Sequence, residues 1–286
     1  MPYAEQRLIT DDGHPVVARL FALGDAPRGA VLIVPAFGVA QTYYADLADW
    51  LARRGFAALT FDYRGTGLSR QGSLRGFHAD VIEDWAGRDC AAALEFLRAQ
   101  APRVPLTWLG HSLGGQIVPF VPNHAELARI ITIATGSGYW RENSPRLKRV
   151  VWWLWYVIVP VTLPLFDYFP GRRLRKVGDL PRRVMEQWRR WCLHPEYLAG
   201  VEGEWARQKY AAVRTPMLSL SFTDDDYMSA RNTESIHSFY VNAPKSFRRI
   251  SPDDAGVKHI GHFGFFRAKF ENALWERYLL PELPAA

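Results

Sequence analysis

The stretch that decides the fold is Leu106-Thr-Trp-Leu-Gly110-His111-Ser112-Leu113-Gly114-Gly115. It reads as a short buried strand that runs into the pattern G-x-S-x-G and then into a helix, which is typical of a nucleophile elbow. Such a turn holds a serine hydroxyl above the carboxyl ends of the strands, and glycines flank it because side chains there would collide. We therefore expect Ser112 to be a nucleophile rather than a helix cap. The N–H of Leu113, at the helix N-terminus, is expected to face a developing oxyanion.

Short apolar runs alternate with amphipathic stretches on both sides of this motif. A hairpin is expected over 6–10 and 15–21. Further strands are expected at 30–34, 56–61, 106–109, 129–134, 216–222 and 246–250, and helices at 41–54, 80–100, 113–120, 230–241 and 263–280. The unbroken apolar runs are typical of parallel strands covered on both faces. The sequence thus predicts an α/β fold with a mostly parallel, doubly wound sheet.

The alternation stops at about residue 136 and returns at about residue 213. Residues 136–212 carry no regular strand pattern and are dense in Trp, Arg and Pro. We predict one catalytic domain, formed by residues 1–135 and 213–286, with residues 136–212 inserted as a cap subdomain.

A serine hydroxyl needs a histidine base, and the base needs an acid to orient it. His262 lies in a loop before the last expected helix and is the favoured base, with His259 as its rival. The acid is expected after the strand at 216–222 or, failing that, after the next strand. The candidates are Asp224, Asp225 and Asp226, with Asp253 and Asp254 as the fallback, and spacing alone does not choose among them.

A second oxyanion donor is expected in the loop after the strand at 30–34. That loop reads Val34-Pro-Ala-Phe37-Gly-Val39, and the N–H of Phe37 is the natural candidate.

These residues together resemble the α/β-hydrolase fold superfamily, most closely its lysophospholipase-like and serine-aminopeptidase-like members. The stretch Phe61-Asp-Tyr-Arg-Gly-Thr-Gly-Leu-Ser69 is similar to a loop of that superfamily as well. The group's acid motif, Asp-x-x-apolar-Pro, selects Asp225 here, with Ser229 in place of the proline. A second departure is Pro35-Ala36, where the superfamily usually has His-Gly.

The resemblance implies a serine hydrolase that cleaves a carboxylic ester through Ser112, His262 and Asp225. The apolar composition of the insert favours an apolar acyl group. Three alternatives stay open: an acyltransferase with the same triad, an aminopeptidase with Glu142 or Glu186 as anchor for the substrate amine, and a non-catalytic binding protein.

Composition excludes other classes of function. The chain of 286 residues has two cysteines, Cys90 and Cys192, too few for a disulfide framework or a cysteine-based zinc site. Dinucleotide, Walker A and H-E-x-x-H patterns are absent, so we expect no cofactor and no metal. No nucleic-acid-binding module accompanies the net charge of +6, so no nucleic-acid partner is expected.

The excess charge and most of the tryptophan lie in residues 136–212. This segment has 14 Lys+Arg against 7 Asp+Glu, and 7 of the 11 Trp. Three interpretations compete: packing against the catalytic domain, an apolar channel for an acyl group, and an interfacial surface whose basic residues within 172–176 and 182–183 meet anionic headgroups. The uncharged run 150–166 is broken by Pro160 and Pro164, which favours a buried or interfacial segment over a spanning helix. Without an apparent signal peptide, we expect a cytoplasmic protein. If residues 136–212 form an interfacial surface, we expect them to bring the protein into peripheral contact with a membrane.

Overall fold

The centre of the molecule is an eight-stranded sheet with the order β1-β2-β4-β3-β5-β6-β9-β10. The computed structural model describes residues 3–22, 24, 26–174 and 177–286. The strands are β1 (Ala4–Ile9), β2 (Pro15–Phe21), β3 (Gly29–Val34), β4 (Phe56–Phe61), β5 (Leu106–His111), β6 (Leu127–Ile133), β9 (Met217–Phe222) and β10 (Lys245–Ile250). The pairs β1–β2 and β2–β4 are antiparallel and the other neighbours are parallel, so the predicted sheet and N-terminal hairpin are confirmed.

Burial explains the character of the strands. All residues of β3, β4, β5 and β9 are buried, which is why these strands are runs of apolar and small residues rather than alternating patterns. The edge strand β10 is mostly exposed and carries Lys245, Arg248 and Arg249, charges that protect an edge from pairing with another chain.

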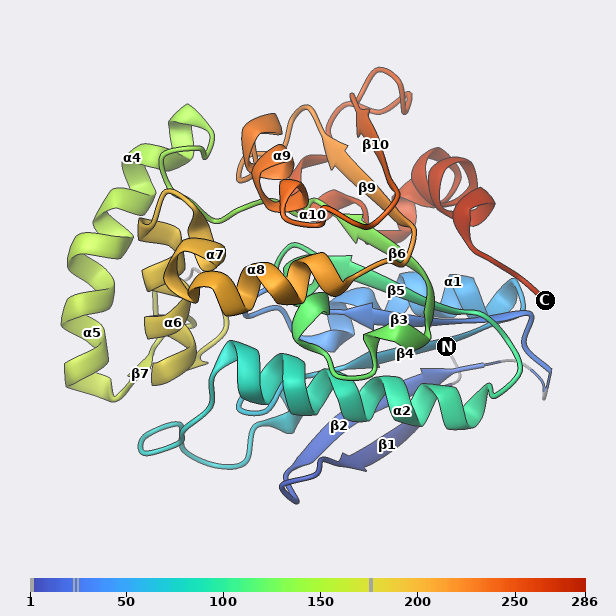
Figure 1. The fold of residues 1–286 in the computed structure, drawn as a ribbon, viewed down its shortest axis with the longest axis horizontal. Helices are drawn as coiled ribbons and strands as arrows, with labels where there is room; N and C mark the ends of the chain where they lie inside the picture. The colour runs from blue at the N-terminus through green and yellow to red at the C-terminus, as the bar shows by residue number, and fades with distance from the viewer. Residues whose placement is uncertain (1–2, 23, 25, 175–176) are drawn as a thin grey trace.

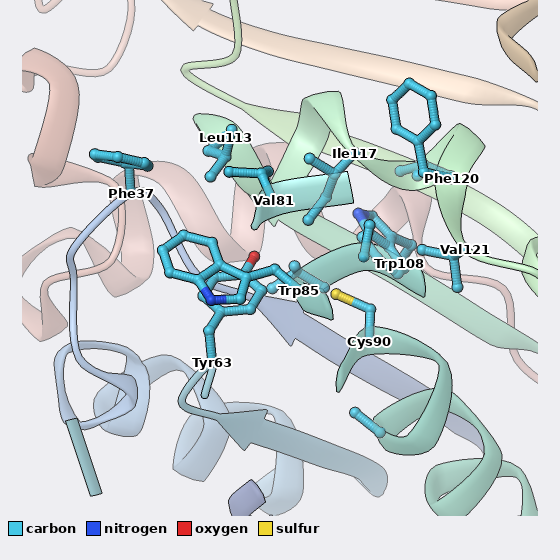
Figure 2. Packing of buried hydrophobic residues seen from close by; sticks show 14 of the residues in the cluster. Phe37, Tyr63, Val81, Trp85, Cys90, Trp108, Leu113, Ile117, Phe120 and Val121 are labelled. Carbon is cyan, nitrogen blue, oxygen red and sulfur yellow. The ribbon is translucent and has the colours of Figure 1, made fainter. Parts of the chain in front are cut away.

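Helices cover both faces of the sheet (Figure 1). One face packs against α1 (Ala45–Arg53), Phe265 and Phe266 directly after α10 (Gly261–Gly264), and the C-terminal turns of Glu271–Leu279. The other face packs against the π-wound segment Val81–Cys90, α2 (Ala91–Gln100), α3 (Leu113–Gln116) and α9 (Ala230–Ser238). On this second face the rings of Tyr63 and Trp85 stack with centroids 4.4 Å apart (Figure 2).

Two expected helices are shorter than the periodicity suggests. The helix expected at 113–120, in which Pro119 and Pro122 predict a kink or a short helix, ends at Gln116 and is followed by a 3₁₀ turn, Val118–Phe120, which contains Pro119. The single helix expected at 263–280 is wrong. The backbone is extended at Arg267 (φ −92°, ψ 136°), so α10 and the turns of Glu271–Leu279 are separate elements.

The segment between β6 and β9 lies beyond the carboxyl ends of the central strands (Figure 1). Its elements are α4 (Pro145–Trp153), α5 (Val159–Phe166), β7 (Tyr168–Phe169), β8 (Leu180–Pro181), α6 (Arg182–Leu193), α7 (Tyr197–Val201) and α8 (Gly203–Ala212). The short pair β7–β8 corrects the expectation that this segment has no strand. Two hydroxyls fix the segment to α3: Tyr197 donates to Oε1 of Gln116 and Tyr210 donates to its carbonyl oxygen.

The uncharged run expected to be interrupted by prolines is helical throughout. Helical turns run from Pro145 to Phe166, and Leu154–Ile158 between α4 and α5 is wound as a π-helix. Pro160 stands in the first turn of α5, directly after this π-wound stretch, where the hydrogen-bond ladder is already offset. We call Pro145–Phe166 the outer helix.

Candidate active site

Ser112 occupies a strained turn between β5 and α3. Its backbone has φ +50° and ψ −112°, a region that residues with side chains rarely adopt. A Cβ atom on Gly110 would lie 2.5 Å from the backbone of Gly114, and a Cβ atom on Gly114 would lie 2.3 Å from the carbonyl oxygen of Val34. The glycines predicted from the motif are therefore required by close backbone approach, and Gly114 packs α3 directly against the end of β3.

The loop after β3 accordingly lies beside the start of α3. Phe37 and Leu113 appear at the same edge of the buried cluster (Figure 2). The N–H of Ala36 donates to the hydroxyl of Tyr44 at 2.8 Å, whereas no protein acceptor among the described residues receives the N–H of Phe37. An N–H that remains free beside a serine turn is suited to binding an oxyanion.

His262 and Asp225 meet across 37 residues of sequence. The imidazole Nδ1 lies 2.9 Å from Oδ2 of Asp225 and 3.2 Å from Oδ1. Both side chains are almost fully buried, so this contact is protected from water. The ring of Tyr227 stacks on His262 with centroids 4.8 Å apart.

The turn after β9 holds the Asp225 carboxylate in place. Its Oδ1 accepts hydrogen bonds from the backbone N–H groups of Tyr227 and Met228, which leaves Oδ2 for the imidazole. Ser229, which replaces the proline of the family motif, caps α9 in a reciprocal pair with Asn232. The departure from the motif is thus compensated by a helix cap that fixes the same turn.

The two rivals from the sequence form a second pair of their own. The carboxylate of Asp224 lies 2.8 Å from Nδ1 of His259. It also accepts hydrogen bonds from the backbone N–H groups of Ile260 and Gly261. It therefore braces the start of α10, the short helix that carries His262 where the sequence predicted a loop. The fallback acid Asp254 instead accepts hydrogen bonds from the backbone and hydroxyl of Ser251.

His111 links the turn at Ser112 to His262. No hydrogen bond joins the Ser112 hydroxyl to His262 among the described residues, but the adjacent His111 ring lies 5.2 Å from the His262 ring, centroid to centroid. Its Nε2 lies 3.1 Å from the carbonyl oxygen of His262 and its Nδ1 lies 2.9 Å from the Tyr44 hydroxyl. Burial holds the pKa of His111 well below its ordinary value, so the ring is neutral.

Sequence reasoning missed the contacts of Tyr44, His111 and Asp224. His111 stands in the variable position of the motif, and Tyr44 looks like any apolar residue of an amphipathic helix, so neither carries a sequence signal. In the described part of the chain no group of three or more His, Cys, Asp or Glu could hold a metal ion, and Cys90 and Cys192 are buried free thiols.

Comparisons with known proteins agree with this architecture. A stretch of 90 residues is 31% identical to monoglyceride lipase from Saccharomyces cerevisiae, and it spans 32% of this chain and 28% of that lipase. The structure of a soluble variant of the same lipase with a substrate analog covers 87% of this chain and 85% of its own, with 17% identity and a TM-score of 0.61. The structure of DcsB with its substrate analogue covers 91% and 92%, with 13% identity and a TM-score of 0.62.

The family described as serine aminopeptidase, S33, matches residues 25–184, more than half of the chain. The chain therefore belongs to the serine aminopeptidase S33 family and has the α/β-hydrolase fold.

Proposed function

We propose that this enzyme cleaves carboxylic esters with an apolar acyl group, with Ser112 as nucleophile, His262 as base and Asp225 as the acid that orients the base. The observation that carries the proposal is the buried contact of 2.9 Å between His262 and Asp225, next to a serine in a strained strand-to-helix turn.

In the first half-reaction, the Ser112 hydroxyl oxygen attacks the ester carbonyl carbon and its proton passes to His262 Nε2. Asp225 accepts the hydrogen bond from Nδ1–H and stabilises the imidazolium that forms. The N–H groups of Phe37 and Leu113 bind the oxyanion. The bond between the carbonyl carbon and the alcohol oxygen then breaks, and the alcohol leaves with the proton from His262.

In the second half-reaction, a water molecule gives a proton to His262 and attacks the acyl carbon. The bond to Ser112 breaks, the proton returns to the serine oxygen, and a carboxylic acid is released.

Aromatic rings beside the oxyanion loop support an apolar acyl group. The ring of Phe37 lies 4.0 Å from Trp188 and 5.9 Å from Trp85, measured between centroids. Trp188 comes from α6, so the segment between β6 and β9 supplies apolar side chains next to the candidate oxyanion loop. The monoglyceride lipase to which the chain is similar is named for a glycerol ester, which is consistent with such a substrate.

The aminopeptidase alternative needs a free carboxylate for the substrate amine, and both candidates are engaged. Glu142 accepts hydrogen bonds from Ser137 and Ser235 and pairs with Arg231. Glu186 pairs with Arg182. Ester hydrolysis needs no such anchor, which favours it over peptide cleavage.

Labelling with a fluorophosphonate probe tests the nucleophile. The probe should attach to the parent enzyme at Ser112, and Ser112→Ala should take up none, while the control Ser73→Ala, on an exposed loop, should be labelled as fast as the parent. Turnover of p-nitrophenyl esters from acetate to palmitate should fall roughly 10⁵-fold in Ser112→Ala. Equal labelling of Ser112→Ala would refute the nucleophile.

The same assay separates the remaining alternatives. An acyltransferase would form a new ester or amide when an alcohol or amine acceptor is added, at the expense of free acid. A non-catalytic binding protein would take up no probe at all.

A further inference from the structure

The outer helix has an apolar face that no part of the described chain covers. Of the fourteen large apolar side chains exposed in the described residues, seven lie on it. They are Val150, Trp152, Trp153, Tyr156, Val157, Val161 and Leu165. A helix on the surface of a soluble domain normally turns charged residues outward, whereas residues 150–166 contain none.

The opposite face of the same helix is packed into the protein. Val151, Trp155, Val159 and Leu163 are buried along one stripe. The Trp155 ring contacts Trp188 edge-on at 5.0 Å, and the Trp155 carbonyl oxygen accepts a hydrogen bond from Arg189. The helix has 22 residues and is long and apolar enough to cross a bilayer. A spanning position would, however, strip this stripe from α6, so the packing favours a helix that lies along a membrane surface.

A basic cavity lies beside the apolar face. Its volume is about 580 Å³, and its wall joins Val159, Pro160, Leu163 and Pro164 of the outer helix to four arginines of α6. Arg182 pairs with Asp167 and Glu186, and Arg189 is bonded to Trp155. Arg183 and Arg190 are exposed and form no ion pair with the described residues. Asp80 and Glu186 are the carboxylates of the wall, so the cavity carries a net positive charge.

Further cations stand at both ends of the outer helix. Arg146, Lys148 and Arg149 lie in or next to its first turns, and Arg172 and Arg173 follow it. Of the arginine-rich run expected from the sequence, Arg175 and Lys176 lie outside the described residues. An apolar strip between cations matches the layered chemistry of a bilayer interface, where acyl chains lie beneath anionic phosphates.

We propose that the outer helix and the cavity beside it form one docking surface for a membrane containing anionic lipids. The apolar face enters the acyl–headgroup boundary, and Arg183 and Arg190 bind lipid phosphates. The docking proposal does not depend on the catalytic proposal. A docked outer helix would, however, place the candidate active site near the membrane surface. The rings of Trp155, Trp188 and Phe37 are in consecutive contact, from the outer helix to the candidate oxyanion loop.

Vesicle flotation of the full-length protein tests the proposal. The protein should float with vesicles of phosphatidylcholine and phosphatidylglycerol and far less with phosphatidylcholine alone. Trp153→Ser/Leu165→Ser and Arg183→Gln/Arg190→Gln should each lower the partition coefficient about tenfold or more. Added salt should weaken binding of the parent and of the serine pair, and have less effect on the glutamine pair.

Matched controls remove the same amount of apolar surface or charge elsewhere. Ile9→Ser/Val241→Ser replaces two equally exposed apolar residues, and Arg75→Gln/Arg103→Gln lowers the net charge by the same amount. These pairs should float like the parent, and circular dichroism should show all variants folded. Equal flotation of docking and control pairs would overturn the proposal.

Two further outcomes would also decide against it. Resistance of bound protein to alkaline carbonate would indicate a spanning helix. A dimer in solution that Trp153→Ser/Leu165→Ser dissociates would assign the apolar face to a second copy of the chain. Ser112→Ala should float normally, so a failure of the ester hydrolysis leaves the docking result intact.

Discussion

The ring of His111 and the carbonyl oxygen of His262 are joined by a hydrogen bond of 3.1 Å. A carbonyl oxygen can only accept, so His111 carries its proton on Nε2. Nδ1 then accepts from the Tyr44 hydroxyl, which itself accepts from the N–H of Ala36. One chain of hydrogen bonds thus connects the loop after β3, the residue before the candidate nucleophile and the backbone of the candidate base.

His111→Phe should lower kcat roughly tenfold to a hundredfold with little change in KM, because the His262 backbone loses its support and the imidazole is misplaced. His111→Gln should recover part of this loss, since its amide N–H can donate to the same carbonyl oxygen. Steady-state kinetics on a soluble ester, with thermal unfolding as the check on folding, measure both. If the Gln variant were as slow as the Phe variant at equal stability, the hydrogen bond would have no positioning role.

Asp225→Asn and Asp224→Asn form a matched pair at adjacent positions. Asp225→Asn should lower kcat by roughly 10³- to 10⁴-fold, because an amide no longer stabilises the imidazolium or its tautomer. Asp224→Asn should cost less than about tenfold, because it only loosens the brace at Ile260, Gly261 and His259. Rates on a p-nitrophenyl ester compare the two, and a larger loss in the Asp224 variant would exchange their assigned roles.

Gly114→Ala should destabilise the fold by about 3 kcal/mol and lower activity, because the added methyl group meets the backbone of Val34. The control Gly87→Ala places its methyl group 3.3 Å from the Ile82 carbonyl oxygen and should stay within about 1 kcal/mol of the parent. Urea unfolding measures both. Equal stability of the two variants would contradict the close packing of α3 on β3.

His237 should make the fold sensitive to acid. It is buried against Thr132 and Thr233, and burial lowers its pKa from 6.5 to about 4. As the pH falls from 6.5 to about 4, the unfolded chain binds a proton that the folded chain refuses, so stability decreases with falling pH. The full loss is about 3 kcal/mol. The urea-unfolding free energy of the parent minus that of His237→Gln should fall by this amount as the pH is lowered across that range. A difference that stays constant would contradict the prediction.

Most of the sheet could be predicted because each central strand is a run of apolar and small residues with no alternation. The helices were less predictable where the backbone leaves helical angles without a Gly or Pro to mark the break. The chain is extended at Arg267, within the single helix expected at 263–280, and no local pattern announces this. The continuity of the outer helix was not predicted either. Pro160 falls just after a π-wound stretch, which the periodicity of the sequence does not reveal.

The candidate site, like the fold, could be predicted from the sequence only where the pattern is local. The motif around Ser112 is local, so sequence suffices to predict the turn and the need for its glycines. The choice between Asp224 and Asp225 depends on where two successive side chains of one turn point, and spacing holds no such information. Only the fold shows that each of them meets a different histidine, His259 before α10 and His262 within it.

The chain leaves the sheet after β6 and returns in β9, and these two strands are parallel neighbours in the sheet. The intervening segment is therefore an insertion between two neighbouring strands, and its length has no influence on the order of the strands. Evolution can lengthen, shorten or replace such an insertion without rebuilding the sheet. In this architecture a change in the segment that carries the outer helix need not alter the turn that holds Ser112.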